Sequence, residues 1–340
     1  MSAASTVTAP WPARPAPDAE AAERLLWYPT VARWAPSKHN TQPWRFVVRD
    51  GSLELWADPS RELPASDPAG RELVLSCGAA LHHLEVAAAA LGRRLAVTLL
   101  PEQGSRLLAR VVESGTTVPT PHDEALLAAV PLRRTDRGPL DRTPLEPALP
   151  FRLQTTAAAH GASLRLVASA GDRTTLGDLV VRADRLLVRH GGVEAELARW
   201  LRDPLSDATD GVPRDRTRGA GASYRAEFVQ RDFAGAGGTS PTHDREGTDN
   251  PLVGVLCTSE DRPVDWLTAG RALSAVLLEA TMAGANASYL NQPVEVPALR
   301  AELRTALQLP GEAQLVLRLG AGAGVAPTPR RPVEDVRFLA

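Results

Sequence analysis

Apolar positions along the chain follow the short period of strands in some segments and the longer period of helices in others. Residues 45–49 and 52–56 predict short strands, and Asp50-Gly51 between them is typical of a two-residue hairpin turn. Residues 71–91 predict a long helix that ends at Gly92. The other predicted helices begin near Asp18 and His122 or lie within 147–159, 172–189, 264–283 and 296–307, and the other predicted strands lie within 96–100, 107–112, 164–168, 252–257, 287–290 and 314–319. This mixture predicts an α+β fold.

Two of the predicted helices resemble each other. Gly78-Ala79-Ala80-Leu81 and Gly270-Arg271-Ala272-Leu273 begin in the same way, and both helices end at a glycine, Gly92 and Gly284. Small residues on one helical face allow two helices to approach closely, which by itself is more typical of packing than of function. The shared spacing indicates an internal duplication, with two similar α+β halves in one chain.

The chain is expected to divide into three parts. Residues 1–17, rich in Ala, Pro and Ser, predict a disordered leader, residues 18–118 a first half, and residues 119–340 a second half. Within the second half, residues 203–250 contain much Gly, Asp, Arg, Ser and Thr and few aliphatic residues. A loop of this length in a compact domain is usually a functional lid or a linker.

Composition excludes several classes of protein. With 38 Lys and Arg against 40 Asp and Glu, the formal charge of −2 provides no field to attract nucleic acid. The only cysteines, Cys77 and Cys257, exclude a disulfide scaffold and a cysteine-based metal cluster built from one chain. No apolar run reaches the roughly 18 residues of a membrane span, and the first residues do not resemble a secretory signal. A cytoplasmic protein is therefore expected.

The densest group of chemically informative residues is a loop bounded by Pro36 and Pro43. It contains Ser37, Lys38, Asn40 and Gln42 and leads directly into a predicted strand, and loops fixed on rigid elements often carry binding residues. Amide side chains both donate and accept hydrogen bonds, which suits the edge of a heterocycle, and the ammonium of the chain's one lysine can stabilise negative charge on such a ring. The alternative is a polar turn that caps a strand.

Two arginine-rich segments suggest an anion site. Residues 133–137, Arg-Arg-Thr-Asp-Arg, combine guanidiniums with a hydroxyl, and arginine binds phosphate and carboxylate groups through two parallel hydrogen bonds. The alternative is a solvated charged turn partly neutralised by Asp136. Near the end of the chain, Gly320 begins a glycine-rich run that precedes Arg330 and Arg331. The prolines that follow exclude a dinucleotide-binding helix there, so the glycines suit a close approach to a ligand or a sharp turn.

His82, His83 and Glu85 superficially resemble metal ligands. Adjacent residues of a helix point about 100° apart, so the two histidines cannot face one ion, and a core or interface helix is the simpler interpretation. No sequence typical of a phosphate-binding Walker loop, a serine hydrolase or a zinc protease is present.

The loop and the arginine segments together resemble a known family. Residues 36–46, Pro-Ser-Lys-His-Asn-Thr-Gln-Pro-Trp-Arg-Phe, are similar to the signature of nitroreductase-like FMN oxidoreductases, and residues 133–137 are similar to that family's phosphate-binding motif. The glycine–proline–arginine tail also resembles the family's last segment. Because the arginine motif follows the loop instead of preceding it, the arrangement resembles the Acg subgroup, in which two degenerate halves form one chain. The resemblance covers roughly residues 18–338.

The resemblance implies a nitroreductase-like fold with antiparallel-rich sheets flanked by helices, and a monomer that imitates the family's homodimer. It assigns the FMN phosphate and ribityl region to Arg133, Arg134, Thr135 and Arg137, with Arg330 and Arg331 adding to the phosphate site. It assigns the flavin ring to the opposite half through Pro36, Ser37, Lys38 and Asn40, with Gln42 supporting that loop. Backbone groups near Leu290 and Asn291 would also approach the ring, and Gly320, in the last segment, is assigned to cofactor binding as well. No catalytic acid or base and no metal are implied.

The activity implied by the resemblance is hydride transfer from NAD(P)H through FMN to a nitroaromatic, quinone or similar acceptor. A lid over the flavin would exclude nicotinamide, so the alternative is a protein that holds or sequesters flavin with little turnover. A metal-dependent hydrolase that uses the helical histidines is a third hypothesis from a different class.

Overall fold

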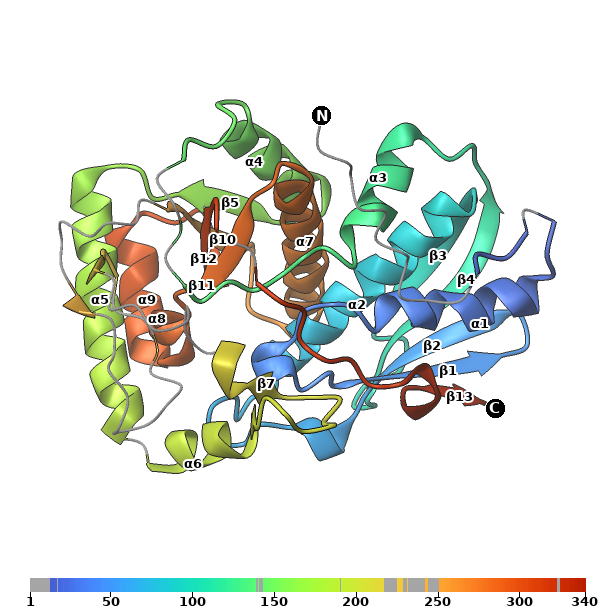
Figure 1. Ribbon diagram of the computed structural model, residues 1–340, viewed down its shortest axis with the longest axis horizontal. Helices are drawn as coiled ribbons and strands as arrows, with labels where there is room; N and C mark the ends of the chain where they lie inside the picture. Colours follow the sequence, from blue (N-terminus) through green and yellow to red (C-terminus); the bar gives the residue numbers. More distant parts are fainter. Residues whose placement is uncertain are drawn as a thin grey trace.

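The structure is a computed structural model with two sheets around a central pair of helices (Figure 1). The predicted leader lies mostly outside the described residues, although Arg14 within it donates to Glu124 and to the carbonyl oxygen of Ala90. The structure describes residues 13–16, 18–138, 140, 143–189, 191–216, 225–228, 231, 242–243, 251–322 and 325–340.

The first sheet has five strands. Strands β1 (Trp44–Arg49) and β2 (Ser52–Ala57) form the predicted hairpin, and the turn between them uses Gly51 at φ 70°. Strands β3 (Arg93–Leu99) and β4 (Leu107–Thr116) continue the sheet, and β13 (Arg337–Leu339) pairs with β1 in parallel. The strand order is β13-β1-β2-β4-β3. The predicted second half therefore contributes a strand to the sheet of the first.

The second sheet has four strands in the order β11-β12-β10-β5, all antiparallel to their neighbours. They are β5 (Ser163–Leu166), β10 (Leu252–Thr258), β11 (Asn286–Tyr289) and β12 (Glu312–Gly320). This order matches β3-β4-β2-β1 of the first sheet, strand for strand and with the same antiparallel pairing. The division into halves at residue 118 stays a prediction.

Helices α2 (Arg71–Ala90) and α7 (Pro263–Met282) lie between the two sheets (Figure 1). They are the pair with similar sequences, and they contact each other through their glycines. A Cβ atom on Gly78 would lie 2.3 Å from the carbonyl oxygen of Leu267, and one on Gly270 would lie 2.0 Å from that of Leu75. The two contacts are reciprocal, because each leucine precedes its own helix's glycine by three residues. The small residues of the sequence repeat therefore allow this helix crossing.

Helix α2 has the length and mean hydropathy, 1.4, of a helix that could cross a membrane, and no other helix does in the described part of the chain. Charged residues, Arg71, Glu72 and Glu85, interrupt this helix, so it is not the uninterrupted apolar run that the sequence excluded. In addition, 78% of its apolar window is buried inside the protein. Its apolar character is that of a core helix packed on all sides.

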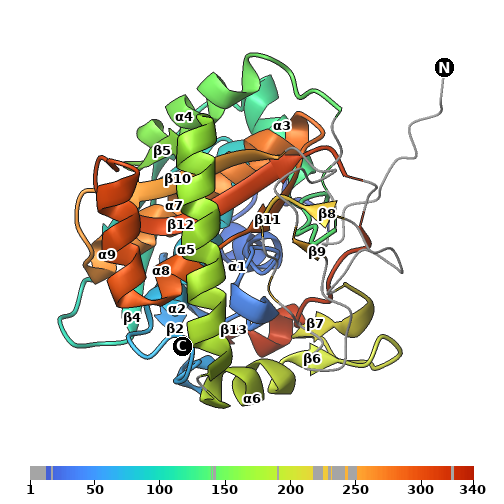
Figure 2. The same ribbon diagram turned by 90° about the vertical axis from the view of Figure 1, so that its left-hand side faces the viewer.

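Most of the remaining helices pack on the central pair or on the second sheet. Helix α1 (Ala21–Ala32) packs on α2, and it begins three residues after the predicted cap, Asp18. Figure 2 shows α5 (Ala170–Arg189) running across the second sheet beside the two helices α8 (Gln292–Glu295) and α9 (Pro297–Ala306). Helices α3 (Pro121–Ala129) and α4 (Leu149–Ala159) contact α7.

Three elements differ from the sequence-based expectation. Gly191, predicted to help end a helix, instead begins α6 (Gly191–Arg199). The predicted helix over 296–307 is confirmed as α9, but the short helix α8 directly before it was not predicted; the two are separate because Val296 adopts an extended conformation between them. Strand β13 was not predicted. The described part of the 203–250 insert includes β7 (Val212–Pro213), which pairs with β6 (Leu201–Arg202).

Candidate functional site

The arginine segment lies along the edge of the second sheet. Thr135 forms a parallel bridge with Ala287 of β11, and the backbone N–H of Asp136 donates to the carbonyl oxygen of Ala287 at 2.8 Å. The carboxylate of Asp136 accepts from the side chain of Asn286 at 3.1 Å. Asp136 therefore fixes the segment to the sheet, whereas the sequence had suggested that it would partly neutralise a solvated turn.

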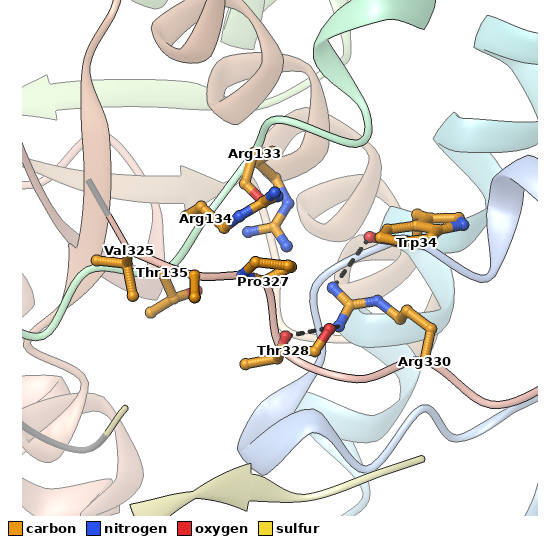
Figure 3. A pocket seen from close by; sticks show the side chains of 9 residues that line it. Trp34, Arg133, Arg134, Thr135, Val325, Pro327, Thr328 and Arg330 are labelled. Atoms are coloured by element: carbon orange, nitrogen blue, oxygen red, sulfur yellow. Dashed lines mark hydrogen bonds between the residues drawn. The ribbon is translucent and has the colours of Figure 1, made fainter. Parts of the chain in front are cut away.

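A cleft lies beside this segment, with about 300 Å³ of empty space that is partly open to solvent (Figure 3). It joins three parts of the chain that are far apart in sequence: the end of the first helix, the arginine segment and the tail. The lining residues are Trp34, Arg133, Arg134, Thr135, Val325, Ala326, Pro327, Thr328 and Arg330. The structure thus brings together four of the residues predicted to hold the phosphate end of a cofactor.

The cleft concentrates positive charge. Arg133 is 5% exposed, and its Nε and Nη1 atoms have no hydrogen-bond acceptor. Burial lowers its pKa below the ordinary value for arginine. Burial, followed by the repulsion of Arg133, Arg134 and Arg33, holds the pKa of Arg330 well below its usual range. No carboxylate pairs with Arg133, Arg134 or Arg330 among the described residues. The arrangement therefore favours a bound anion.

Trp34 supports the guanidiniums of this cleft. Its ring lies between Arg33 at 5.4 Å and Arg330 at 5.6 Å, distances typical of cation–π contacts. The carbonyl oxygen of Trp34 also accepts from Arg330 at 3.3 Å, as Figure 3 shows. Sequence reasoning did not select Trp34 as a site residue. Its position directly before the proline-bounded loop is the signal that could have indicated it.

The proline-bounded loop has a strained backbone. His39, Asn40 and Gln42 have positive φ angles of 50°, 56° and 52°, which residues other than glycine seldom adopt. The hydroxyl of Ser37 accepts from the backbone N–H of Gln42 at 2.9 Å and helps to fix this conformation. Several such residues close together are typical of functional sites.

The amides of this loop hold other segments in place. Asn40 donates to the carbonyl oxygens of Gly211 at 2.9 Å and Pro329 at 3.0 Å, and it accepts from Arg330 at 3.1 Å. Gln42 donates to the carbonyl oxygen of Thr209 at 2.9 Å. The role of Gln42 in supporting the loop beside a flavin stays a prediction. Asn40, predicted to contact a flavin ring, donates both amide hydrogens to protein carbonyl oxygens.

Lys38 lies in a buried ion-pair cluster. Its Nζ atom is 2.7 Å from Glu72 and 3.4 Å from Glu295, and it donates to the carbonyl oxygen of Ser66 at 3.0 Å. Burial alone would lower the pKa of Lys38, but Glu295 and Glu72 raise it above its ordinary value. Glu72 belongs to α2 of the predicted first half and Glu295 to α8 of the predicted second half, so the ammonium links the two halves.

His39 connects the loop to the arginine segment. Burial, and then the charges of Lys38, Arg231 and Arg137, hold the pKa of His39 well below its ordinary value. Arg137 is itself buried, and burial lowers its pKa to about 10 although Tyr289 and Asp136 partly offset the effect. The charge of Arg137 thus acts on His39, which places the loop and the arginine segment within electrostatic range of each other.

Other predicted residues have contacts that stabilise the fold. Leu290 is fully buried in the core, and Asn291 accepts from the backbone N–H of Val316 at 3.0 Å. Gly320 ends β12 where a Cβ atom would lie 2.9 Å from the side chain of Leu140, so its small size serves packing there. Arg331 donates to the carbonyl oxygens of Gln42 and Asp335, and Pro36 is buried at the start of the loop. Contacts of these residues with a cofactor stay predictions.

Tyr289 is a second residue that sequence reasoning missed. It lies on β11 within hydrogen-bonding reach of Thr135, and its pKa is raised by burial although Arg133 and Arg137 oppose this effect. Its position directly before the selected Leu290 is the only signal in the sequence. His82, by contrast, contacts Ser274 of α7 at 2.9 Å, and no group of three potential metal ligands occurs within the described ranges.

Comparison of the sequence with known proteins gives close matches to proteins of Mycobacterium tuberculosis. The chain is 36% identical over 325 residues to "Putative NAD(P)H nitroreductase Rv3131", which covers 94% of this chain and 92% of that protein. It is 33% identical over 308 residues to "Putative NAD(P)H nitroreductase acg", which covers 89% of this chain and 91% of that protein. The sequence matches no family model.

Comparison with solved structures gives a nitroreductase with bound FMN from Bacteroides fragilis. The two are 14% identical, the match covers 61% of this chain and 93% of that chain, and the TM-score is 0.37.

Proposed function

Because the chain belongs to the nitroreductase-like family that includes the Acg protein, we propose that it binds FMN and acts as an NAD(P)H-dependent oxidoreductase. The cleft supports this proposal through the chemistry of its side chains. The observation that carries it is Arg133, a buried guanidinium with two nitrogen atoms that have no acceptor and no carboxylate partner among the described residues. A buried charge without a partner is costly, so a bound anion would stabilise it.

The side chains of the cleft suit the charge of an FMN phosphate. Arg133, Arg134 and Arg330 would pair with its negative charges, and the hydroxyl of Thr135 would add a neutral donor. Arg330 is already positioned, because Asn40, Thr328 and the carbonyl oxygen of Trp34 accept from it. A site in which the cations are fixed before binding loses less conformational entropy when the phosphate arrives.

The flavin ring would be held by the proline-bounded loop and by the buried groups between the loop and the arginine segment. Glu72 and Glu295 fix the ammonium of Lys38, so its charge would act on a bound ring from a set position. Arg137 belongs to the arginine segment, and Tyr289 of β11 lies within hydrogen-bonding reach of Thr135 in that segment. When bound, FMN would supply hydride chemistry between NAD(P)H and a nitroaromatic, quinone or similar acceptor. The side chains would bind and orient it, without a dedicated acid or base.

We further propose that the chain is a monomer that imitates a dimer, with one cleft built from both halves. The equal strand order of the two sheets and the reciprocal contacts of Gly78 and Gly270 support two related halves. The cleft itself combines Trp34 from the first half with Arg133 and Arg330 from the second.

The test compares FMN with riboflavin, which lacks the phosphate. Flavin fluorescence quenching during titration of FMN-depleted protein would measure both dissociation constants. We expect riboflavin to bind about 100-fold more weakly or worse, since charge-assisted hydrogen bonds contribute about 1.5–3 kcal/mol each. Equal affinity for the two flavins would show that the cleft does not hold the phosphate.

The alternative function is a protein that holds flavin with little or no turnover. One observation favours it: residues 209 and 211 of the insert are hydrogen-bonded to the proline-bounded loop, which restricts movement beside the site. Anaerobic addition of NADH or NADPH to the FMN-loaded protein separates the two functions. A reductase loses the visible flavin absorbance promptly, whereas a flavin-holding protein stays yellow.

A further inference from the structure

Residues 200–213, which include the first residues of the insert, form a strap that crosses the proline-bounded loop. Asp210 within the strap pairs with Arg202 at 2.7 Å and with Arg61 at 2.9 Å. Arg61 also donates to the carbonyl oxygen of Thr41 in the loop at 2.7 Å. Asp210 therefore fixes one point of the strap through ion pairs that do not involve the arginine cleft.

Asn40 fixes a second point of the strap. Its side chain donates to the carbonyl oxygen of Gly211 at 2.9 Å, and its own carbonyl oxygen accepts from the backbone N–H of Gly211 at 3.2 Å. Gly211 has a φ angle of 72°, and a Cβ atom there would lie 2.6 Å from the carbonyl oxygen of Trp200. The strap thus turns tightly at the residue that Asn40 holds.

The same amide contacts the arginine cleft. The Oδ1 atom of Asn40 accepts from Nη1 of Arg330 at 3.1 Å, while the Nε atom of Arg330 has no acceptor. Arg330 lines the cleft and is repelled there by Arg133 and Arg134. One carboxamide therefore contacts both the strap and a cation of the anion site.

We propose that Asn40 couples the two regions, so that an anion in the arginine cleft strengthens the attachment of the strap to the loop. An anion would neutralise the repulsion on Arg330 and hold its guanidinium where Nη1 meets Oδ1 of Asn40. With its oxygen held, the amide directs one N–H toward the carbonyl oxygen of Gly211 and the other toward that of Pro329. Coupling between two sites is reciprocal, so attachment of the strap would also tighten anion binding. In this proposal Asn40 is a positioning residue.

The coupling rests on the proposed function only in requiring that the cleft binds a phosphate group. Hydrogen exchange in the strap, measured by mass spectrometry on the full chain, tests it with inorganic phosphate and separately with FMN. Isothermal titration calorimetry first establishes that each probe binds. We expect exchange at Gly211 to become about fivefold slower or more when the cleft is occupied.

Two variants of Asn40 and one matched control identify the path. Asn40→Gly accepts the positive φ angle without strain and removes the amide, and Asn40→Asp keeps the oxygen but cannot donate to Gly211. In both variants, bound phosphate should no longer slow exchange at Gly211. In the control, Asp210→Asn, the strap loses ion pairs and should exchange faster overall, but phosphate should still slow it.

The outcomes are separable. If phosphate binds but leaves exchange of the wild-type strap unchanged, the coupling is wrong and the anion site stands. If phosphate still slows exchange in a folded Asn40 variant, the coupling does not pass through Asn40 and the proposal fails. If neither phosphate nor FMN binds, the proposed function and the coupling both fail. Circular dichroism establishes that each variant is folded.

Discussion

Replacing Arg133 with methionine should change stability and FMN binding in opposite directions. The guanidinium of Arg133 is buried, two of its nitrogen atoms have no acceptor, and burial lowers its pKa. An unsatisfied buried polar group costs about 1–3 kcal/mol, and a charged group costs more. Methionine keeps most of the apolar stem and removes the charge, so Arg133→Met should stabilise the ligand-free protein by roughly 1–3 kcal/mol. The same change removes charge-assisted bonds to the phosphate and should weaken FMN binding about 10- to 150-fold.

The assay has two parts and a matched control. Urea unfolding in a buffer free of phosphate and sulfate measures stability, and flavin fluorescence quenching measures FMN affinity. Arg24 provides the control, because it is also buried but forms an ion pair with Glu113. Arg24→Met leaves this carboxylate without its cation and should destabilise the protein by at least about 1.5–3 kcal/mol, with no change in FMN affinity.

The reasoning is refuted if Arg133→Met destabilises the ligand-free protein as much as Arg24→Met does. In that case the protein itself stabilises the guanidinium of Arg133, and no bound anion is needed to explain its burial. Unchanged FMN affinity in Arg133→Met would refute the placement of the phosphate. Added sulfate should stabilise the wild type more than Arg133→Met, which provides an independent check without flavin.

Two further predictions concern stability. Burial, followed by the charge of Glu72, raises the pKa of Asp67 to about 6 from an unfolded value of 3.8. The contribution of Asp67 to the free energy of unfolding should therefore be greatest below pH 3.8 and should be lost as the pH rises through 6. In urea unfolding across this pH range, Asp67→Asn should show a smaller decline in stability than the wild type. Gly78→Ala and Gly270→Ala place a Cβ against backbone in the α2–α7 crossing and should each destabilise the protein by about 1–3 kcal/mol or more. Gly177→Ala, with only an ordinary 3.9 Å contact to Phe228, should be neutral or stabilising, and comparable losses in all three variants would contradict the reciprocal crossing.

The parts of the fold that follow from local sequence could be predicted. Asp50-Gly51 indicated the hairpin and Gly92 the end of α2, because both glycines adopt the left-handed conformation that such turns need. Strand β13 could not be predicted, since its three residues become a strand only by pairing with β1 at the opposite end of the chain. Gly191 was misinterpreted for a related reason: glycine is common where a helix ends, and its neighbours did not indicate that a second helix begins there.

The chemistry of the candidate site could be predicted better than its connections. Arg133, Arg134, Thr135 and Arg330 were selected from residue type, and they line one cleft. Asn40 was selected for its amide, but its donors bind carbonyl oxygens 171 and 289 positions away, in segments whose positions the sequence does not reveal. A side chain's capacity to bind can be read from its type, whereas its partner depends on which distant segments the fold brings beside it.

The pattern of buried cations distinguishes a binding site from imperfect packing. Three buried cations outside the cleft have acidic or amide partners: Arg24 pairs with Glu113, Lys38 with Glu72 and Glu295, and Arg71 with Gln314 and Glu72. Inside the cleft, Arg133 has no such partner in the described part of the chain. An unpaired buried charge reduces stability, so a ligand that supplies the negative charge would explain why Arg133 lacks the acidic partner that Arg24 and Lys38 have. The same logic explains why the cations gather where two distant segments of one chain meet: neither segment alone can bury them, so the anion site depends on the complete fold.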